Sequence, residues 1–317
     1  MTKESTIQPF VKGDVFAGVT LLNNPDDDHA GDGRIIQYDA DLNEKGVLWT
    51  QGTTHLVGGL KFGPDGNLWA FDSMAFAVIR VSPEGKQLPA IKFADKSFSN
   101  VCFLPDGNLI FGEHLVGNEI KLPPDRPLKT TLPFMPGTER FGDGHVFKFT
   151  MDGELLQEFN TETHGGMPGF LGCTSTTLLP DGKTLVYNSE LGNRVFRYDL
   201  EADRQLPDLI TYTPESGDMV ISSALYQGDK LLHIKANFRK GFVLQILDLD
   251  GNEIRTYEMP PPPGWAGLGT SIEDNMAFVG NFFTGSFMKF NLETGEPVAT
   301  ADTGVQRSLA GIAQYPG

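Results

Sequence analysis

Several histidines that could act in catalysis or bind a metal lie in predicted loops of this chain. His55 and His164 fall between predicted strands, and His114 directly follows Glu113 at the end of one. Neutral imidazole is a common metal ligand and the usual general base near neutral pH. No local spacing such as HExxH brings these groups together, so a catalytic or metal-binding cluster depends on the fold. The alternative is that they are surface and loop histidines.

Polar side chains also recur where predicted inner strands end, about six residues after a turn glycine. These residues are Asp72, Glu113, Asn188, Lys235 and Asn281. A divalent ion, calcium or zinc, held by Asp72, Glu113, Asn188 and Asn281 would polarise a carbonyl group. It would also lower the pKa of a bound water from about 15.7 toward about 7. Lys235 would then stabilise an oxyanion, and His55 or His164 would move the proton.

Three other features have a structural interpretation beside the functional one. His233 lies in an otherwise apolar layer, and we expect a hydrogen-bonded core histidine there. The acidic tract 26–32 could hold calcium but matches no calcium-binding motif, and a solvated turn is the alternative. A proline-rich insertion at about 115–142 could cover a small-molecule pocket or pack against a neighbouring blade.

The elements that must position these residues follow an internal repeat. An apolar-apolar-Arg/Lys/Gln-apolar segment occurs six times, and successive copies start 43, 68, 49, 48 and 44 residues apart. Without the insertion, the long interval is near 40 residues. Such a period is typical of architectures in which each repeat is one supersecondary unit. The six copies begin at Ile35, Val78, Val146, Val195, Val243 and Phe287.

A Pro-Asp-Gly sequence precedes several copies and lies between two apolar runs, as at Pro64–Gly66, Pro105–Gly107 and Pro180–Gly182. Proline sets φ near −65° and glycine tolerates a positive φ, so this sequence predicts a hairpin turn. Each repeat then reads as four antiparallel strands. Six such units predict an all-β, six-bladed β-propeller in a single domain, residues 1–317.

The two ends of the chain support this fold. Residues 310–317 match the first strand of a blade, while residues 13–16 read as a second strand. We therefore expect the C-terminal strand to complete the N-terminal blade, which removes an exposed sheet edge. The long loops between second and third strands, and between blades, share one rim, and this rim is the predicted functional face.

Composition excludes several functions. The net charge is −16, with 25 basic and 41 acidic residues and no basic cluster, so nucleic acid and anionic membranes are not expected partners. The two cysteines, Cys102 and Cys173, lie in apolar stretches and predict buried thiols. With no signal-like start and no long apolar run, we expect a cytoplasmic protein. Its oligomeric state is not indicated.

The segments GLKFGPDGNLWAFDS, VCFLPDGNLIFGEH and LLPDGKTLVYNSELGNRVFRYDL are similar to the six-bladed propellers of the gluconolactonase/regucalcin family, also called senescence marker protein, and to NHL-repeat propellers. The phrase GPDGNLW also resembles the streptogramin lyases. The lactonase resemblance implies a calcium-dependent site, with Glu, Asn and Asp ligands ahead of the innermost strands. This sequence departs from that pattern, because it has Gly58, Ser99, Thr174 and Ala310 there, with Asn100 adjacent.

Two classes of function follow. The first is an enzyme acting on a small molecule at the channel mouth, by metal-assisted hydrolysis or ring opening of a lactone or ester, with a metal-assisted lyase as a variant. The second is a non-catalytic propeller module that binds a metabolite or a protein.

Overall fold

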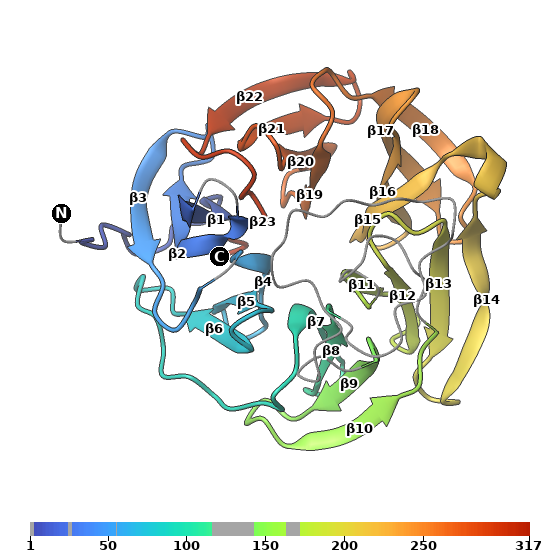
Figure 1. The fold of residues 1–317 in the computed structure, drawn as a ribbon, viewed down its shortest axis with the longest axis horizontal. Coiled ribbons are helices and arrows are strands. Elements are labelled where there is room, and N and C mark those ends of the chain that lie inside the picture. The colour runs from blue at the N-terminus through green and yellow to red at the C-terminus, as the bar shows by residue number, and fades with distance from the viewer. Residues whose placement is uncertain (1–2, 25–26, 55, 116–142, 163–171) are drawn as a thin grey trace. The chain divides into compact units, whose positions relative to one another are not determined.

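The computed structural model of the chain describes residues 3–24, 27–54, 56–115, 143–162 and 172–317. The fold is a six-bladed β-propeller, as the repeat predicts (Figure 1). The chain divides into two compact units, unit 1 from Met1–Ile91 and Gly264–Gly317, and unit 2 from Lys92–Pro263. Each unit contains three sheets. In the described ranges, no helix has the length and apolar character needed to cross a membrane.

Unit 1 contains two four-stranded sheets and one three-stranded sheet. The N-terminal sheet has the order β23(Gly311–Gln314), β1(Val15–Asn24), β2(Asp27–Tyr38), β3(Glu44–Trp49). The second sheet has the order β4(Gly58–Phe62), β5(Leu68–Asp72), β6(Ala77–Val81). The third has the order β19(Trp265–Thr270), β20(Met276–Asn281), β21(Ser286–Asn291), β22(Glu296–Asp302). In the second sheet a single bridge, Val81 to Gln87, stands where a fourth strand was expected.

Unit 2 contains three four-stranded sheets. The first has the order β7(Phe98–Phe103), β8(Leu109–Glu113), β9(Val146–Phe149), β10(Leu155–Phe159). The second has the order β11(Ser175–Leu178), β12(Thr184–Asn188), β13(Arg194–Asp199), β14(Arg204–Thr211). The third has the order β15(Met219–Tyr226), β16(Lys230–Asn237), β17(Gly241–Asp248), β18(Glu253–Glu258). A 3-10 turn, Pro214–Ser216, lies between β14 and β15.

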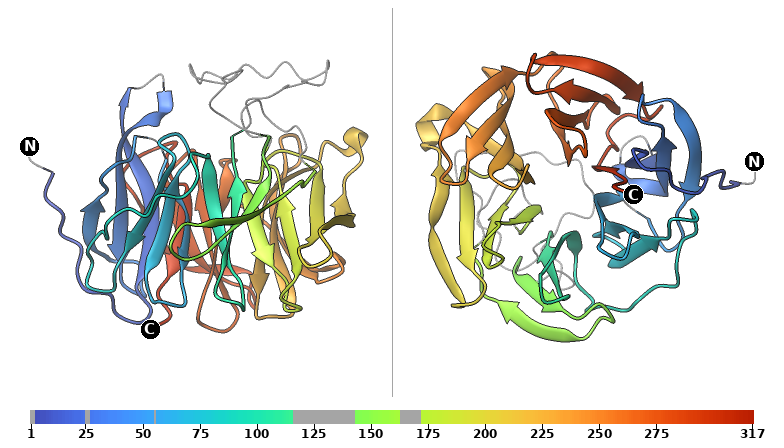
Figure 2. Two further views of the ribbon diagram at one scale, coloured as in Figure 1. Left: turned by 90° about the horizontal axis from the view of Figure 1, so that it is seen from below. Right: turned by 180° about the vertical axis from the view of Figure 1, so that it is seen from behind.

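The C-terminal strand completes the N-terminal blade, as the sequence predicts. In the antiparallel pairing of β23 with β1, Gln314 lies opposite Val15 and Gly311 opposite Gly18. The C-terminal end of the chain therefore lies beside the N-terminal blade (Figure 2). The pairing covers one edge of β1, and β2 covers the other.

The Pro-Asp-Gly turns have the predicted conformation. Their glycines, Gly66, Gly107 and Gly182, have φ values of 77°, 83° and 72°. In each turn the aspartate Oδ1 accepts a hydrogen bond from the backbone N–H two residues further on. A residue with a Cβ is strained at positive φ, so glycine is required at these positions.

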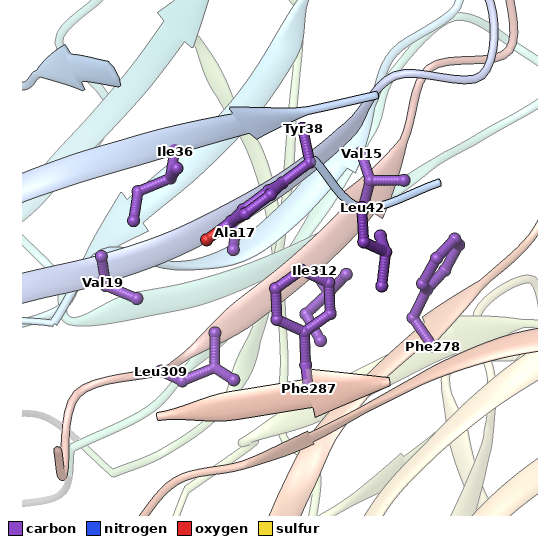
Figure 3. Packing of buried hydrophobic residues seen from close by; sticks show 10 residues of the cluster. All are labelled: Val15, Ala17, Val19, Ile36, Tyr38, Leu42, Phe278, Phe287, Leu309 and Ile312. Carbon is purple, nitrogen blue, oxygen red and sulfur yellow. The ribbon is translucent and has the colours of Figure 1, made fainter. Parts of the chain in front are cut away.

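The core of unit 1 follows the alternation of β1 (Figure 3). Val15, Ala17 and Val19 are fully buried and belong to one cluster with Tyr38 and Phe287. The two aromatic rings meet edge to face, with their centroids 5.2 Å apart. Burial of a side chain such as Phe287 contributes about 1.5–3 kcal/mol to folding.

The inner strands of unit 2 are joined by polar side chains. Asn100 of β7 accepts a short hydrogen bond from the hydroxyl of Thr176 in β11. Ser175 of β11 donates to the carbonyl of Ser223 in β15 at 3.3 Å. Cross-blade bonds of this kind set the register of neighbouring blades more specifically than apolar contact alone. Both cysteines are buried free thiols, as predicted.

Candidate functional site

Asp72 and Asn281 are the last residues of β5 and β20, and each closes the turn that follows its strand. One side-chain oxygen of each accepts the backbone N–H groups two and three residues further on, at 3.0–3.1 Å. The second oxygen of Asp72 accepts the N–H of Thr54 at 2.7 Å. Both side chains therefore hold loop conformations in unit 1.

The equivalent residue in the third blade of unit 2 is Asn237, and not the predicted Lys235. Strand β16 ends at Asn237, whose Oδ1 accepts the N–H groups of Arg239 and Lys240 at 3.0 and 3.1 Å. Lys235 lies two residues inside the strand and is half-buried. Strand β16 has eight residues, three more than β5, β8 and β12, so the predicted position falls inside it.

Glu113, at the end of β8, is 1% exposed. Its Oε2 accepts the N–H of Gly144 at 3.0 Å, and the ammonium of Lys96 lies 3.6 Å from Oε1. Both contacts hold this carboxylate in one orientation.

The backbone after Glu113 joins this blade to the next one. The Glu113 carbonyl accepts the N–H of Cys173 at 2.8 Å, and the His114 carbonyl accepts the N–H of Gly172 at 3.3 Å. The Gly172 carbonyl in turn accepts the hydroxyl of Ser189 at 2.7 Å. Burial, together with the charge of Glu113, raises the pKa of Cys173, which therefore stays a neutral thiol.

Asn188, the last residue of β12, has structural partners on both ends of its amide. Its Oδ1 accepts the hydroxyl of Ser175 at 2.8 Å, and its Nδ2 donates to the carbonyl of Ile221 at 3.0 Å. It links β12 to the inner strand of its own blade and to the neighbouring blade.

Glu190 has a carboxyl group whose pKa is raised by burial. It lies in the turn between β12 and β13 and is half-buried. Burial raises its pKa from 4.5 to about 7, because the charged form loses hydration. A carboxyl group with a pKa near the working pH can both accept and return a proton.

Lys235 lies beside a buried chain of hydrogen bonds. Its ammonium is 5.7 Å from the centre of the Tyr212 ring, whose hydroxyl bonds Nε2 of His233 at 3.1 Å. Nδ1 of His233 bonds the hydroxyl of Ser223 at 2.9 Å. Burial, with a smaller effect of Lys235, lowers the pKa of His233 to about 3. His233 is thus the neutral, hydrogen-bonded core histidine that the sequence predicts.

The Glu190 turn and the backbone of Lys235 flank the start of β15. Val220 accepts the N–H of Leu191 and donates its own N–H to the carbonyl of Gly192, both at 2.8 Å. On its other side, Val220 is paired with Lys235. The backbone of the Glu190 turn and the backbone of Lys235 therefore both contact Val220, at the start of one strand of unit 2. We define Glu190, Tyr212, His233 and Lys235 as the candidate site.

Some predicted residues lie outside the described ones. These are His55, His164, residues 116–142 of the insertion, and the side chains of 25–29. His145 is described, and its Nδ1 lies 2.9 Å from Oε1 of Glu158.

The described residues fit a divalent metal ion poorly. Across them, no group of three or more His, Cys, Asp or Glu side chains is placed to hold one. The oxygens of Asp72 and Asn281 accept backbone N–H groups, and that of Asn188 accepts a hydroxyl. An oxygen that faces N–H donors is poorly placed for a cation. The predicted metal site stays a prediction, and no step below uses it.

The sequence analysis did not select Glu190 or Tyr212. Glu190 is two residues beyond a predicted strand end, in the segment Asn188-Ser189-Glu190-Leu191-Gly192. An acidic residue in a short turn, between a strand end and an apolar residue, can be recognised in the sequence. Its burial depends on distant segments and is not contained in the local pattern.

No family model matches the sequence, and no curated protein matches it. Similar solved structures include one titled nidogen/laminin complex, with 11% identity, a TM-score of 0.63, and coverage of 96% of this chain and 98% of that chain. A protein of unknown function from Bacteroides caccae has 14% identity, a TM-score of 0.62, and coverage of 97% and 100%. Catalytically inactive virginiamycin B lyase from Staphylococcus aureus, with quinupristin, has 13% identity, a TM-score of 0.51, and coverage of 97% and 87%. These similarities show the propeller fold, while membership of the lactonase family stays a prediction.

Proposed function

We propose that this protein is an enzyme that opens a lactone or ester bond of a small molecule at the candidate site. The observation that carries the proposal is the half-buried carboxyl group of Glu190, with a pKa of about 7, one strand away from Lys235. A site that combines a proton-exchanging acid and a fixed cation suits reactions in which an oxygen gains negative charge.

In hydrolysis, ionised Glu190 takes a proton from water as the water oxygen attacks the carbonyl carbon. The ammonium of Lys235 stabilises the resulting oxyanion. When the carbon–oxygen bond to the leaving group breaks, Glu190 returns its proton to the alkoxide. The products are a carboxylic acid and an alcohol, and the enzyme is regenerated.

Elimination is the closest variant. Glu190 would remove the proton next to the carbonyl group, the carbon–oxygen bond would break, and an alkene and a carboxylic acid would form. One structural neighbour is named virginiamycin B lyase, so the assay should also test for elimination. Product analysis separates the two, because only hydrolysis incorporates oxygen from water.

The second candidate function is a binding module without catalysis. The observation that favours it is the exposed turn of unit 2 that holds Phe238, Arg239 and Lys240, in which an aromatic ring lies beside two cations. One structural neighbour is titled as a protein complex, nidogen with laminin.

The test is an assay of a panel of lactones and esters with the intact chain and the variant Glu190→Gln. We expect turnover of at least one compound class and a loss of about 10²–10⁴-fold in kcat on substitution. The control is Glu154→Gln, an exposed carboxylate of unit 2, which should retain full activity. Absence of turnover, or equal activity of both variants, would contradict the proposal and favour the binding module.

A further inference from the structure

The turn after β16 is basic and aromatic in an otherwise acidic protein. Phe238, Arg239 and Lys240 are consecutive and exposed, whereas the chain as a whole carries a net charge of −16. The equivalent turns after Asp72 and Asn281 have the same hydrogen-bonded geometry but contain no cation, since their sequences are Ser-Met-Ala and Phe-Phe-Thr. The cations are therefore not required by the turn itself.

This turn is held rigidly. The amide of Asn237 donates to Oδ1 of Asp218 at 2.7 Å and to the carbonyl of Ser216 at 3.0 Å. The oxygen of the same side chain accepts the two backbone N–H groups of Arg239 and Lys240. Four hydrogen bonds from one buried side chain fix where the exposed residues project. A ligand would therefore lose little affinity to ordering of the turn.

Phe238 presents an aromatic surface beside these charges. Its ring meets that of Phe242 edge to face at 5.8 Å, which orients it although it is 62% exposed. An exposed, oriented ring can pack against another planar group, and such pairs contribute about 0.5–1.5 kcal/mol beyond area burial. Arg239 adds a planar guanidinium that can donate two parallel hydrogen bonds to a carboxylate.

Lys235 lies in the same hairpin, between Lys230 and the turn, and belongs to the candidate site. Asp218 lies beside the turn, where its Oδ1 accepts a hydrogen bond from the amide of Asn237. The hairpin therefore extends positive charge from the rim turn toward the Glu190 turn, through Lys235 and its partner strand.

We propose that the end of the β16–β17 hairpin is an anion-recognition subsite, and that its ligand is a small carboxylate that carries a planar ring. This inference rests on the proposed function, because it identifies the ligand as the substrate of that reaction. The ring packs on Phe238, the carboxylate is bound by Arg239 and Lys240, and the reactive end of the molecule points toward Lys235 and Glu190.

The test uses benzoate as the probe in an amide NMR titration of the intact chain. We expect saturating shifts at residues 238–241 with a dissociation constant of about 1 mM. In the variant R239Q/K240Q the dissociation constant should rise at least about tenfold, the loss of one charge-assisted contact. The control variant K12Q/K86Q removes two exposed cations of unit 1 and should bind as the wild type does.

Two further probes separate the contribution of the negative charge from that of the planar ring. Benzyl alcohol lacks the charge and cyclohexanecarboxylate lacks the planar ring, so both should bind more weakly than benzoate. Shifts of equal size in R239Q/K240Q and wild type, or equal binding of all three probes, would overturn the subsite.

Failure of this inference and failure of the proposed function give different results. Glu190→Gln should leave benzoate binding unchanged, because that side chain is assigned to proton transfer and not to the ring carboxylate. If Glu190→Gln loses activity but the wild-type chain does not bind benzoate, only the proposed subsite is contradicted. Benzoate binding at 238–241 in a chain that turns over no lactone or ester would retain the subsite and remove the enzyme.

Discussion

The hydroxyl of Tyr212 is hydrogen-bonded to Nε2 of His233 at 3.1 Å, and the same tyrosine ring lies beneath the ammonium of Lys235. A buried histidine thus fixes the surface on which a half-buried lysine rests. Protonation of His233 would place a second positive charge close to Lys235, which is one reason why its pKa is low. The ring contact with Tyr212 therefore orients the ammonium of Lys235.

Replacement of His233 should change how stability depends on pH. Folding lowers the pKa of His233 from its reference value of 6.5 to about 3. The contribution of this histidine to stability is therefore complete above pH 6.5 and is lost progressively as the pH falls toward 3. We expect His233→Gln to be less stable than wild type at pH 7, because the amide replaces the ring imperfectly. Chemical denaturation should show this deficit shrinking between pH 6.5 and pH 4. A constant deficit would mean that folding does not lower the pKa of His233.

Replacement of Glu190 should have the opposite pH signature. Its folded pKa is raised from 4.5 to about 7, so its contribution to stability is greatest below 4.5 and is lost as the pH rises through 7. At pH 8 we expect Glu190→Gln to be more stable than wild type by about 2 kcal/mol, reduced from the full shift because water reaches the half-buried side chain. At pH 4 the two should be equal. Carboxyl NMR of the wild type should give a titration midpoint near 7, and a midpoint near 4.5 would remove the basis for its role.

The sequence predicts the repeat and its turns better than it predicts the site. Asp72, Glu113, Asn188 and Asn281 each lie at the last residue of a strand, and for the first three a Pro-Asp-Gly turn marks where that strand begins. The count fails at Lys235 because β16 has eight residues, whereas β5, β8 and β12 have five. The pKa of Glu190 depends on burial by segments distant in sequence, and no local pattern contains that information. The fourth strand expected in the second blade is reduced to one bridge, between Val81 and Gln87.

Removal of metal ions tests the metal site that the sequence predicts at the ends of the inner strands. Because the oxygens of Asp72 and Asn281 accept backbone N–H groups, we expect metal analysis of protein purified without chelator to find no stoichiometric ion. Thermal unfolding with and without EDTA should then coincide. A stoichiometric calcium or zinc ion that is lost in Asp72→Ala or Glu113→Ala would contradict this expectation and restore a metal-assisted reaction.

Two substitutions of Tyr212 separate its ring from its hydroxyl. Tyr212→Phe keeps the ring beneath Lys235 but leaves Nε2 of His233 without its present partner, which we expect to cost about 1–3 kcal/mol of stability. Tyr212→Leu removes the ring as well, and with it a cation–π contact of about 0.5–1 kcal/mol. After isotopic methylation of lysines, the NMR signal of Lys235 should keep its ring-current shift in Tyr212→Phe and lose it in Tyr212→Leu. If Tyr212 positions Lys235, kcat should fall further in Tyr212→Leu than in Tyr212→Phe, whereas a purely structural role would rank the two variants by their stability alone.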